Sequence, residues 1–168
     1  MKARICKICA ESGIFCEQCD YKIKQRIVSM TEVEISRFMY EAESKFKELE
    51  YVQIEYVADV GNDLVLILIS SPTMLKPSFL ASLTKFVSEK SGKMIKIVEK
   101  TADIKRLVSQ ILHPIRVLSI NQIWSPDGSY EFSVKVNSQD FKKSSINQSS
   151  IERVLTELLQ FETRIQPV

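Results

Sequence analysis

The residues of this sequence that are best suited to chemistry are its cysteines. All four lie in the stretch CKICAESGIFCEQC, where two C-x2-C pairs are separated by six residues. Two tight turns of this kind can present four thiolates to one ion, and four sulfur ligands suit tetrahedral zinc with every position filled. Metal binding would also stabilise a segment that is too short to fold alone. The spacing therefore predicts a structural zinc site formed by Cys6, Cys9, Cys16 and Cys19.

Other uses of these cysteines fit the pattern less well. An iron–sulfur cluster is an alternative, although the successive C-x2-C steps of bacterial ferredoxins are not met. A redox dithiol normally belongs to a larger strand-and-helix unit. Disulfides are typical of short secreted chains with a signal peptide, and the N-terminal MKARICKICAE has no apolar core. The spacing leaves open whether a zinc module would be purely structural or would also contact nucleic acid.

No apolar run of the sequence matches a membrane helix. The longest charge-free run, Leu64 to Leu75, is far shorter than the roughly twenty apolar residues that span a bilayer. Clustered cysteines without a disulfide pattern are typical of a reducing compartment. We therefore expect a cytoplasmic protein with no membrane partner.

Charge is unevenly distributed along the 168 residues, of which 45% are hydrophobic and 26% charged. The net charge is only +2, but residues 67–116 hold nine basic and three acidic side chains. A local basic excess can mark a phosphate-binding surface, and lysines on ordinary solvated faces are the alternative. The candidate nucleic-acid-binding residues are Lys76, Lys85, Lys90, Lys93, Lys96, Lys105, Arg106 and Arg116.

Hydrophobic periodicity predicts two similar units after a polar linker over 20–30. Each unit reads helix, strand, strand, helix, strand in about 70 residues, which indicates duplicated α+β domains rather than one sheet. The expected division is a cysteine module with its linker over 1–30, a first unit over 31–100 and a second over 101–168. The expected strands are 52–60, 64–70, 93–99, 115–124, 130–136 and 161–168.

Four amphipathic helices complete this pattern. The first begins at Thr31, with Glu34 in a capping box, and the last at Ser149, with Glu152 in the same role. The two between them lie over 79–91 and 104–112. Glutamates surround the apolar face of the first helix and predict a solvated acidic face without a function. These are Glu32, Glu34, Glu41, Glu43, Glu48 and Glu50.

Side chains for catalysis are not apparent. The only histidine, His113, precedes a proline at a helix end, and no nucleophile–base pair, Walker loop or glycine-rich dinucleotide turn is present. Trp124, Tyr130 and Phe132 have rings that can stack on bases, but their positions on hairpin strands predict that at least two of them pack in the core. We expect a protein that is not an enzyme and has no small-molecule substrate.

Two stretches carry a resemblance to a known family. The second unit opens with ILHPIRVLSI and is similar to the second KH domain of the NusA transcription factors. The first unit ends with SEKSGKMIKIVEKTADIKRL and is similar to the first KH domain and its joint to the second. Together with the cysteines, nearly the whole chain resembles archaeal NusA-like KH proteins with an N-terminal zinc module. The resemblance implies an α+β chain with a small zinc module and two tandem type II KH-like domains.

The resemblance also implies a GxxG loop in each KH unit, whose backbone approaches a phosphate while bases lie in the adjoining groove. A side chain would block that approach, which is why glycine is needed. By position the loops fall near Ser78–Ala81 and Asn147–Ser150, and neither contains glycine. All four glycines of the chain have other structural explanations. We therefore expect degenerate KH-like domains without GxxG.

The resemblance implies a non-catalytic RNA-binding factor in transcription elongation or termination, or on ribosomal RNA. RNA polymerase or the ribosome would then be its partner, and basic side chains would supply salt-dependent binding. The alternative is a protein–protein adaptor whose KH folds have lost RNA binding. A DNA-binding regulator that uses the cysteine module also stays open.

Overall fold

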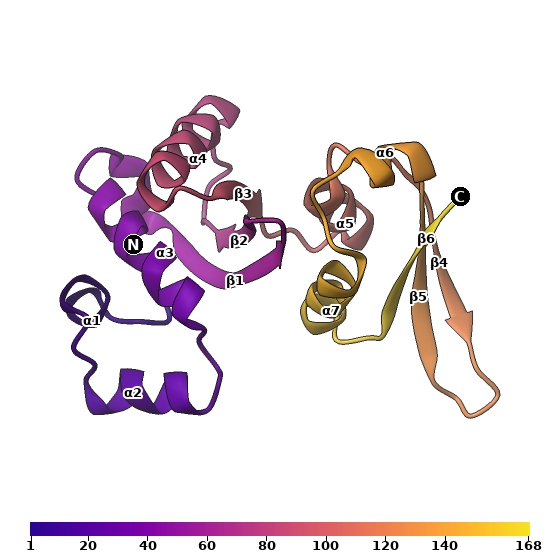
Figure 1. Cartoon of the computed structure of the whole chain (residues 1–168), viewed down its shortest axis with the longest axis horizontal. Coiled ribbons are helices and arrows are strands. Elements are labelled where there is room, and N and C mark those ends of the chain that lie inside the picture. Colours follow the sequence, from indigo (N-terminus) through magenta and orange to yellow (C-terminus); the bar gives the residue numbers. More distant parts are fainter. The chain divides into compact units, whose positions relative to one another are not determined.

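The computed structural model describes all residues, 1–168, as an α+β chain that divides into two compact units. The first unit comprises Met1–Asp59 and Val65–Lys100. The second comprises Thr101–Val168 together with the short segment Val60–Leu64. Each unit is built around one three-stranded sheet (Figure 1).

The first unit begins with the cysteine segment and continues into helices and a sheet of strand order β1-β2-β3. Its elements are α1 (Lys7–Ser12), α2 (Glu17–Lys24), α3 (Met30–Ala42), the 3-10 helix η1 (Lys47–Tyr51), β1 (Gln53–Gly61), β2 (Leu64–Ser70), α4 (Pro77–Ser91) and β3 (Met94–Glu99).

The core of the first unit lies between this sheet and two helices. The central strand β2 is buried at every position from 65 to 69, which explains its continuous apolar sequence. Ile35 and Met39 of α3 and Leu83 and Val87 of α4 are fully buried against it. The ring of Phe79 is also part of this core, as its sequence position predicted. The sheet thus supports two neighbouring helices, α3 and α4.

Three predictions for the start of this unit are wrong. The expected linker over 20–30 is largely helical, because α2 continues to Lys24 and α3 starts at Met30. The N-cap of α3 is Ser29 rather than Thr31, since the Ser29 hydroxyl accepts a hydrogen bond from the Glu32 backbone N–H at 3.1 Å. Glu32 does not belong to a solvated face, because it is completely buried.

The second unit consists of two longer helices and one short helix around a sheet of order β4-β5-β6. Strands β4 and β5 are antiparallel, and β5 and β6 are parallel. The elements are α5 (Ile104–Leu112), β4 (Val117–Trp124), β5 (Tyr130–Val136), α6 (Ser138–Lys143), α7 (Gln148–Leu159) and β6 (Thr163–Pro167). The buried residues that α5 and α7 contribute include Val108, Leu112, Val154 and Leu155.

The short helix α6 was not predicted from the sequence. Its six residues bury no side chain, so the sequence shows no apolar periodicity there. Its N-cap is Asn137, which accepts a hydrogen bond from the Asp140 backbone N–H at 3.0 Å. The next helix, α7, is likewise capped by Asn147, which accepts from the Ser150 backbone N–H at 3.1 Å. Ser149, the predicted cap, lies inside the helix.

Candidate metal centre and nucleic-acid interface

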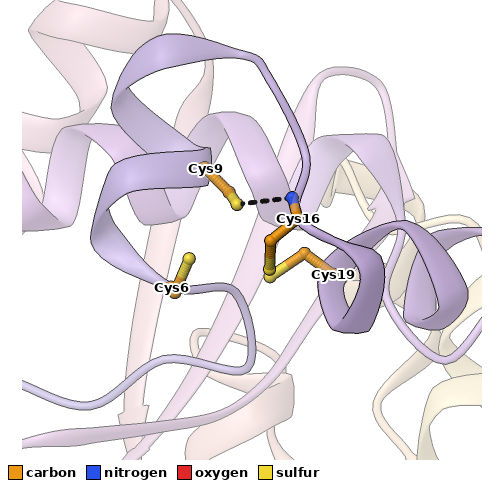
Figure 2. A group of neighbouring side chains, drawn as sticks. All are labelled: Cys6, Cys9, Cys16 and Cys19. Atoms are coloured by element: carbon orange, nitrogen blue, oxygen red, sulfur yellow. Dashed lines mark hydrogen bonds between the residues drawn. The ribbon is translucent and has the colours of Figure 1, made fainter.

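The four cysteine side chains point toward one another from the starts of α1 and α2 (Figure 2). Their sulfur atoms all lie within 4.8 Å of one another. The cluster has a buried side and an open side, because Cys9 and Cys19 are buried whereas Cys6 and Cys16 are exposed. This arrangement can hold one metal ion, as the spacing predicted.

Both C-x2-C pairs have the same local geometry. Cys6 and Cys16 are N-cap residues with extended backbone. Cys9 and Cys19 follow in the first turn of α1 and α2. A side chain at the N-cap and one three residues later lie on the same side of a first helical turn, as in a capping box. Each pair therefore presents both of its sulfurs to one point.

Hydrogen bonds and burial give these thiols different pKa values. The Cys19 backbone N–H and the thiols of Cys19 and Cys9 lower the pKa of Cys16 to about 7. The Cys16 backbone N–H, at 3.1 Å from the Cys9 sulfur, lowers the pKa of Cys9, but the Cys6 thiol and burial outweigh it and raise that pKa to about 12. Burial also raises the pKa of Cys19. Four thiolates side by side therefore require a cation, which deprotonates the thiols that coordinate it.

The cysteine segment is packed onto α3 through a small core of its own. The residues that share this core are Ile5, Cys9, Ala10, Cys19, Val28, Val33 and Tyr40. The Tyr40 hydroxyl is buried and donates a hydrogen bond to the Ile5 carbonyl at 3.0 Å. Val33 and Tyr40 belong to α3, so the cysteine segment packs directly onto a helix of the first unit.

A buried ion pair reinforces this packing. The Arg4 guanidinium donates to both carboxylate oxygens of Glu32, with Nε at 2.7 Å from Oε1. The Lys22 ammonium donates to the Arg4 carbonyl at 2.8 Å and so connects α2 to the same group of interactions. Burial raises the pKa of Glu32, and the nearby Arg4 and Lys22 charges oppose that shift. Arg4, 28 residues away in the sequence, thus favours the charged form of Glu32 against the effect of burial.

The eight predicted nucleic-acid-binding residues are divided between the two units. The first unit contains five of them, Lys76, Lys85, Lys90, Lys93 and Lys96, and the second contains Lys105, Arg106 and Arg116. Lys76 is the N-cap residue of α4 and is exposed, and Lys96 is half-buried in β3, where burial lowers its pKa to about 8. Lys105 and Arg106 are exposed at the start of α5.

Half of these residues form ion pairs with acidic side chains. Lys90 pairs with Glu41, and the Lys93 ammonium lies 3.1 Å from Glu34, so both engage glutamates of α3. The remaining two pairs are Lys85 with Glu89 at 3.9 Å and Arg116 with Asp140 at 2.7 Å. Much of the basic excess of residues 67–116 therefore faces carboxylates of the same protein.

The two positions predicted for the missing GxxG loops are helical. Ser78–Ala81 lies in the first turns of α4, where Phe79 is buried. Because α4 is the single helix between β2 and β3, the first unit has no helix–helix connection at this point. Asn147–Ser150 forms the start of α7. In the second unit the connection between two successive helices is instead Ser144–Asn147, a few residues earlier than predicted, because α6 was not foreseen.

Sequence reasoning missed the lysines beside this connection. Lys142 and Lys143 form the last turn of α6, and both are exposed without an ion pair. Ser144, Ser145 and Asn147 follow directly, so the connection is polar apart from the buried Ile146. These lysines lie outside the basic block of residues 67–116. Only a correct prediction of the neighbouring helix–helix connection would have identified them as candidates.

The aromatic residues of the second unit are not core residues, which corrects the prediction for Trp124, Tyr130 and Phe132. Trp124 is 67% exposed, and the other two are half-buried. Their rings form a cluster with Phe161, in which the ring centroids of Tyr130 lie 4.8 Å from Trp124 and 4.3 Å from Phe161. We call these four residues the hairpin cluster.

No helix of the structure is both long and apolar enough to cross a membrane.

Comparisons with known proteins bear on the fold alone. No family model matches the chain, and no curated protein matches it. Among solved structures, 72 chains match. One of them, described as "Crystal structure of APE1850", is 23% identical with a TM-score of 0.52, over 78% of this chain and 96% of that chain. The chain therefore shares its α+β fold with known structures.

Proposed function

We propose that this protein is a non-catalytic, zinc-stabilised RNA-binding factor of the cytoplasm that resembles the NusA transcription factors. The observation that carries the proposal is the order of elements in the second unit, α5-β4-β5-α6-α7-β6, with a parallel β5–β6 pair. This order supports a type II KH-like domain, in which RNA meets the connection between the two middle helices.

Zinc is the ion that the cysteine cluster suits best. Four sulfurs around one zinc ion at about 2.3 Å define a tetrahedron with edges of about 3.8 Å. The spread of 4.8 Å among the four sulfurs is close to that size. Two cysteines are buried and the cluster shares a core with α3, so the ion would hold structure rather than perform chemistry.

The RNA contact that we propose lies at the α6–α7 connection. Lys142 and Lys143 are free to approach phosphates, and the backbone N–H groups at the start of α7 favour an anion. The exposed Lys105 and Arg106 of α5 add positive charge in the same unit. Without glycine the connection would bind RNA through charge more than through a close backbone clamp, with little sequence preference.

The test is the affinity of the whole zinc-loaded protein for a single-stranded RNA, measured over a range of salt concentrations. Replacing both Lys142 and Lys143 by alanine should weaken binding about 10- to 30-fold and lower the slope of log affinity against log salt by about 1.4, because each single-strand phosphate contact contributes about 0.7. Lys135→Ala is the matched control, since Lys135 is exposed on β5 of the same unit. Equal affinity of wild type and double variant would contradict the assignment of this site.

A second candidate is a protein–protein adaptor of the transcription or translation machinery. Four of the eight predicted basic residues are engaged by carboxylates, and the first unit has only one helix where two would flank an RNA loop. An adaptor would bind RNA polymerase or ribosomal proteins equally well after nuclease treatment. RNA affinity that is negligible at moderate salt in the wild type would favour this candidate.

A further inference from the structure

The hairpin cluster lies at an end of the second sheet that is only two strands wide. Strand β6 begins opposite Phe132, where Thr163 is its register partner. Trp124 and Tyr130, which face each other across β4 and β5, lie beyond that point. Figure 1 shows the β4–β5 hairpin continuing past the end of β6. The inner face of the sheet, buried at Val134, therefore continues into aromatic side chains that stay open to solvent.

The strand beside this cluster is also an edge of the sheet. In the order β4-β5-β6, β4 has a neighbour on one side only. It is the most open strand of the unit, and its exposed apolar residues include Leu118 at 55%, Ile123 at 42% and Trp124 at 67%. An edge strand with exposed apolar side chains is a template for pairing with another chain, and soluble proteins normally protect such edges with charge or proline. β4 contains neither.

Carboxylates dominate the surroundings of the cluster. The Arg164 guanidinium is shared by Glu131 at 3.2 Å and Glu162 at 2.9 Å, so one positive charge serves two negative ones. Asp127 in the hairpin turn accepts hydrogen bonds from the Ser129 hydroxyl and backbone N–H, which lower its pKa and keep it ionised. The electrostatic environment therefore favours a cationic ligand.

We propose that the β4 edge and the hairpin cluster bind an extended segment of a partner protein in which apolar side chains alternate with arginine or lysine. Such a segment would add a fourth strand to the sheet through main-chain hydrogen bonds. Because successive side chains of a strand point to opposite faces, its apolar residues would cover Trp124 and Tyr130. Its cations would lie on the other face, where Ile123 is the register partner of Glu131.

The same observations disfavour RNA as the occupant. Bases can stack on exposed rings, but the phosphates that follow them need cations. Arg164 is already held by two carboxylates, and Lys142 and Lys143 lie after the far end of β5, on α6. The inferred partner site is thus separate from the proposed RNA contact, and either can fail without the other.

The test uses the single tryptophan as a reporter, because Trp124 lies within the site. A phage-displayed random peptide library is selected on the whole protein, with counter-selection on the double variant W124S/F161S. Peptides that survive are synthesised and titrated while Trp124 emission and its quenching by acrylamide are measured. We expect alternating basic and apolar sequences that shift the emission to shorter wavelength and reduce quenching.

Two variants check the geometry of binding. I123K places a cation beside Glu131, on the face where the cations of the segment would lie, while E131Q/E162Q removes two of the negative charges near the site. Each should weaken a selected peptide about tenfold, the scale of a residue that contributes about 1.4 kcal/mol to binding. Y51S, which removes an exposed tyrosine of the first unit, is the control and should leave affinity unchanged. Far-UV circular dichroism verifies that each variant is folded.

Other outcomes would overturn the proposal. Failure to enrich any peptide over the W124S/F161S variant would show that the edge is not a peptide site. An oligouridylate that protects Trp124 from acrylamide, with no effect of selected peptides, would assign the rings to RNA. A wild-type dimer in sedimentation that I123K dissociates would assign the β4 edge to a second copy of this chain.

Discussion

The two units place their positive charge in different surroundings. In the first unit, Lys90 of α4 and Lys93, just before β3, pair with glutamates of α3, so charge contributes to internal pairing. In the second unit, Lys142 and Lys143 are exposed beside a helix–helix connection and form no ion pair. The difference indicates that a run of lysines in a sequence identifies a binding surface only where the fold supplies no carboxylates to meet it.

The units also differ in what stabilises them. The first unit contains the metal cluster and the Arg4–Glu32 pair in addition to its apolar core. The second contains no cysteine and leaves its aromatic hairpin open. We therefore expect perturbations of metal and buried charge to affect the first unit, and perturbations of surface charge to affect the binding properties of the second.

Metal removal should give the largest difference between the units. Structural zinc contributes about 10–16 kcal/mol to the folding of zinc-finger peptides, so chelation or Cys9→Ser should unfold the segment over 5–28. Amide hydrogen exchange should accelerate there and stay slow over 104–165. Ser12→Ala, at the end of α1, is the control. One zinc ion per chain is expected, and unchanged exchange after complete metal removal would show that the cluster does not hold the fold.

Breaking the buried ion pair should have the next largest effect. Arg4→Ala leaves the Glu32 carboxylate buried without its partner and should destabilise the first unit by about 3–5 kcal/mol. Arg4→Ala/Glu32→Gln should recover part of this loss, because the amide carries no charge. Urea denaturation at neutral pH measures both, and a loss that the double variant does not reduce would place the effect elsewhere.

This effect should depend on pH in a definite direction. Because burial raises the pKa of Glu32, the folded protein holds that proton more tightly than the unfolded chain does. The stability contributed by Glu32 is therefore full below its unfolded pKa and falls as pH rises through the folded pKa. Arg4→Ala removes an interaction that opposes the shift, so its destabilisation should be larger at pH 8 than at pH 5. A loss that is the same at both values would contradict this account.

Removing surface lysines should affect RNA binding differently in the two units, with a smaller effect than the changes above. Lys90→Ala/Lys93→Ala removes two cations that form ion pairs, whereas Lys142→Ala/Lys143→Ala removes two exposed cations that form none. On RNA, the first pair should weaken binding less than about threefold, compared with 10- to 30-fold or so for the second. Fluorescence anisotropy with a labelled single-stranded RNA measures both, and the reverse order would move the interface to the first unit.

Helix caps should give the smallest effects. Asn147→Ala removes the cap of α7 and should cost about 1 kcal/mol of stability. Lys76→Ala at the equivalent position of α4 should change stability by less than about 0.5 kcal/mol, since the Lys76 side chain makes no cap hydrogen bond. Thermal denaturation distinguishes these values, and equal losses would argue against Asn147 as a specific cap.

Features encoded by nearby residues could be predicted from the sequence. The cysteine spacing predicted the cluster, because helix starts place positions three residues apart on one side. The strand expected over 64–70 matches β2, whose apolar run is buried at every position from 65 to 69. The caps of α3 and α7 were each predicted two residues too late, because Ser29 and Asn147 compete with serine or threonine residues just inside the helix.

Features that depend on distant residues could not be predicted in this way. The burial of Glu32 depends on Arg4, whose position relative to α3 is set by the folding of the cysteine segment. The exposure of Trp124 depends on where β6 begins, almost forty residues later along the chain. Neither property appears as a local sequence pattern, because each depends on the packing of elements that are distant in the sequence.

The shared interior of the cysteine segment and α3 has a practical consequence for dividing this protein. A shortened chain that starts at Met30 would expose Val33 and Tyr40 and leave Glu32 with no guanidinium. Such a fragment would be prone to aggregate for reasons unrelated to any binding function. Measurements on the first unit alone therefore need the cysteine segment. Those on the second unit need Val60–Leu64, because the Val60 carbonyl accepts a hydrogen bond from the Asn147 backbone N–H at 2.9 Å.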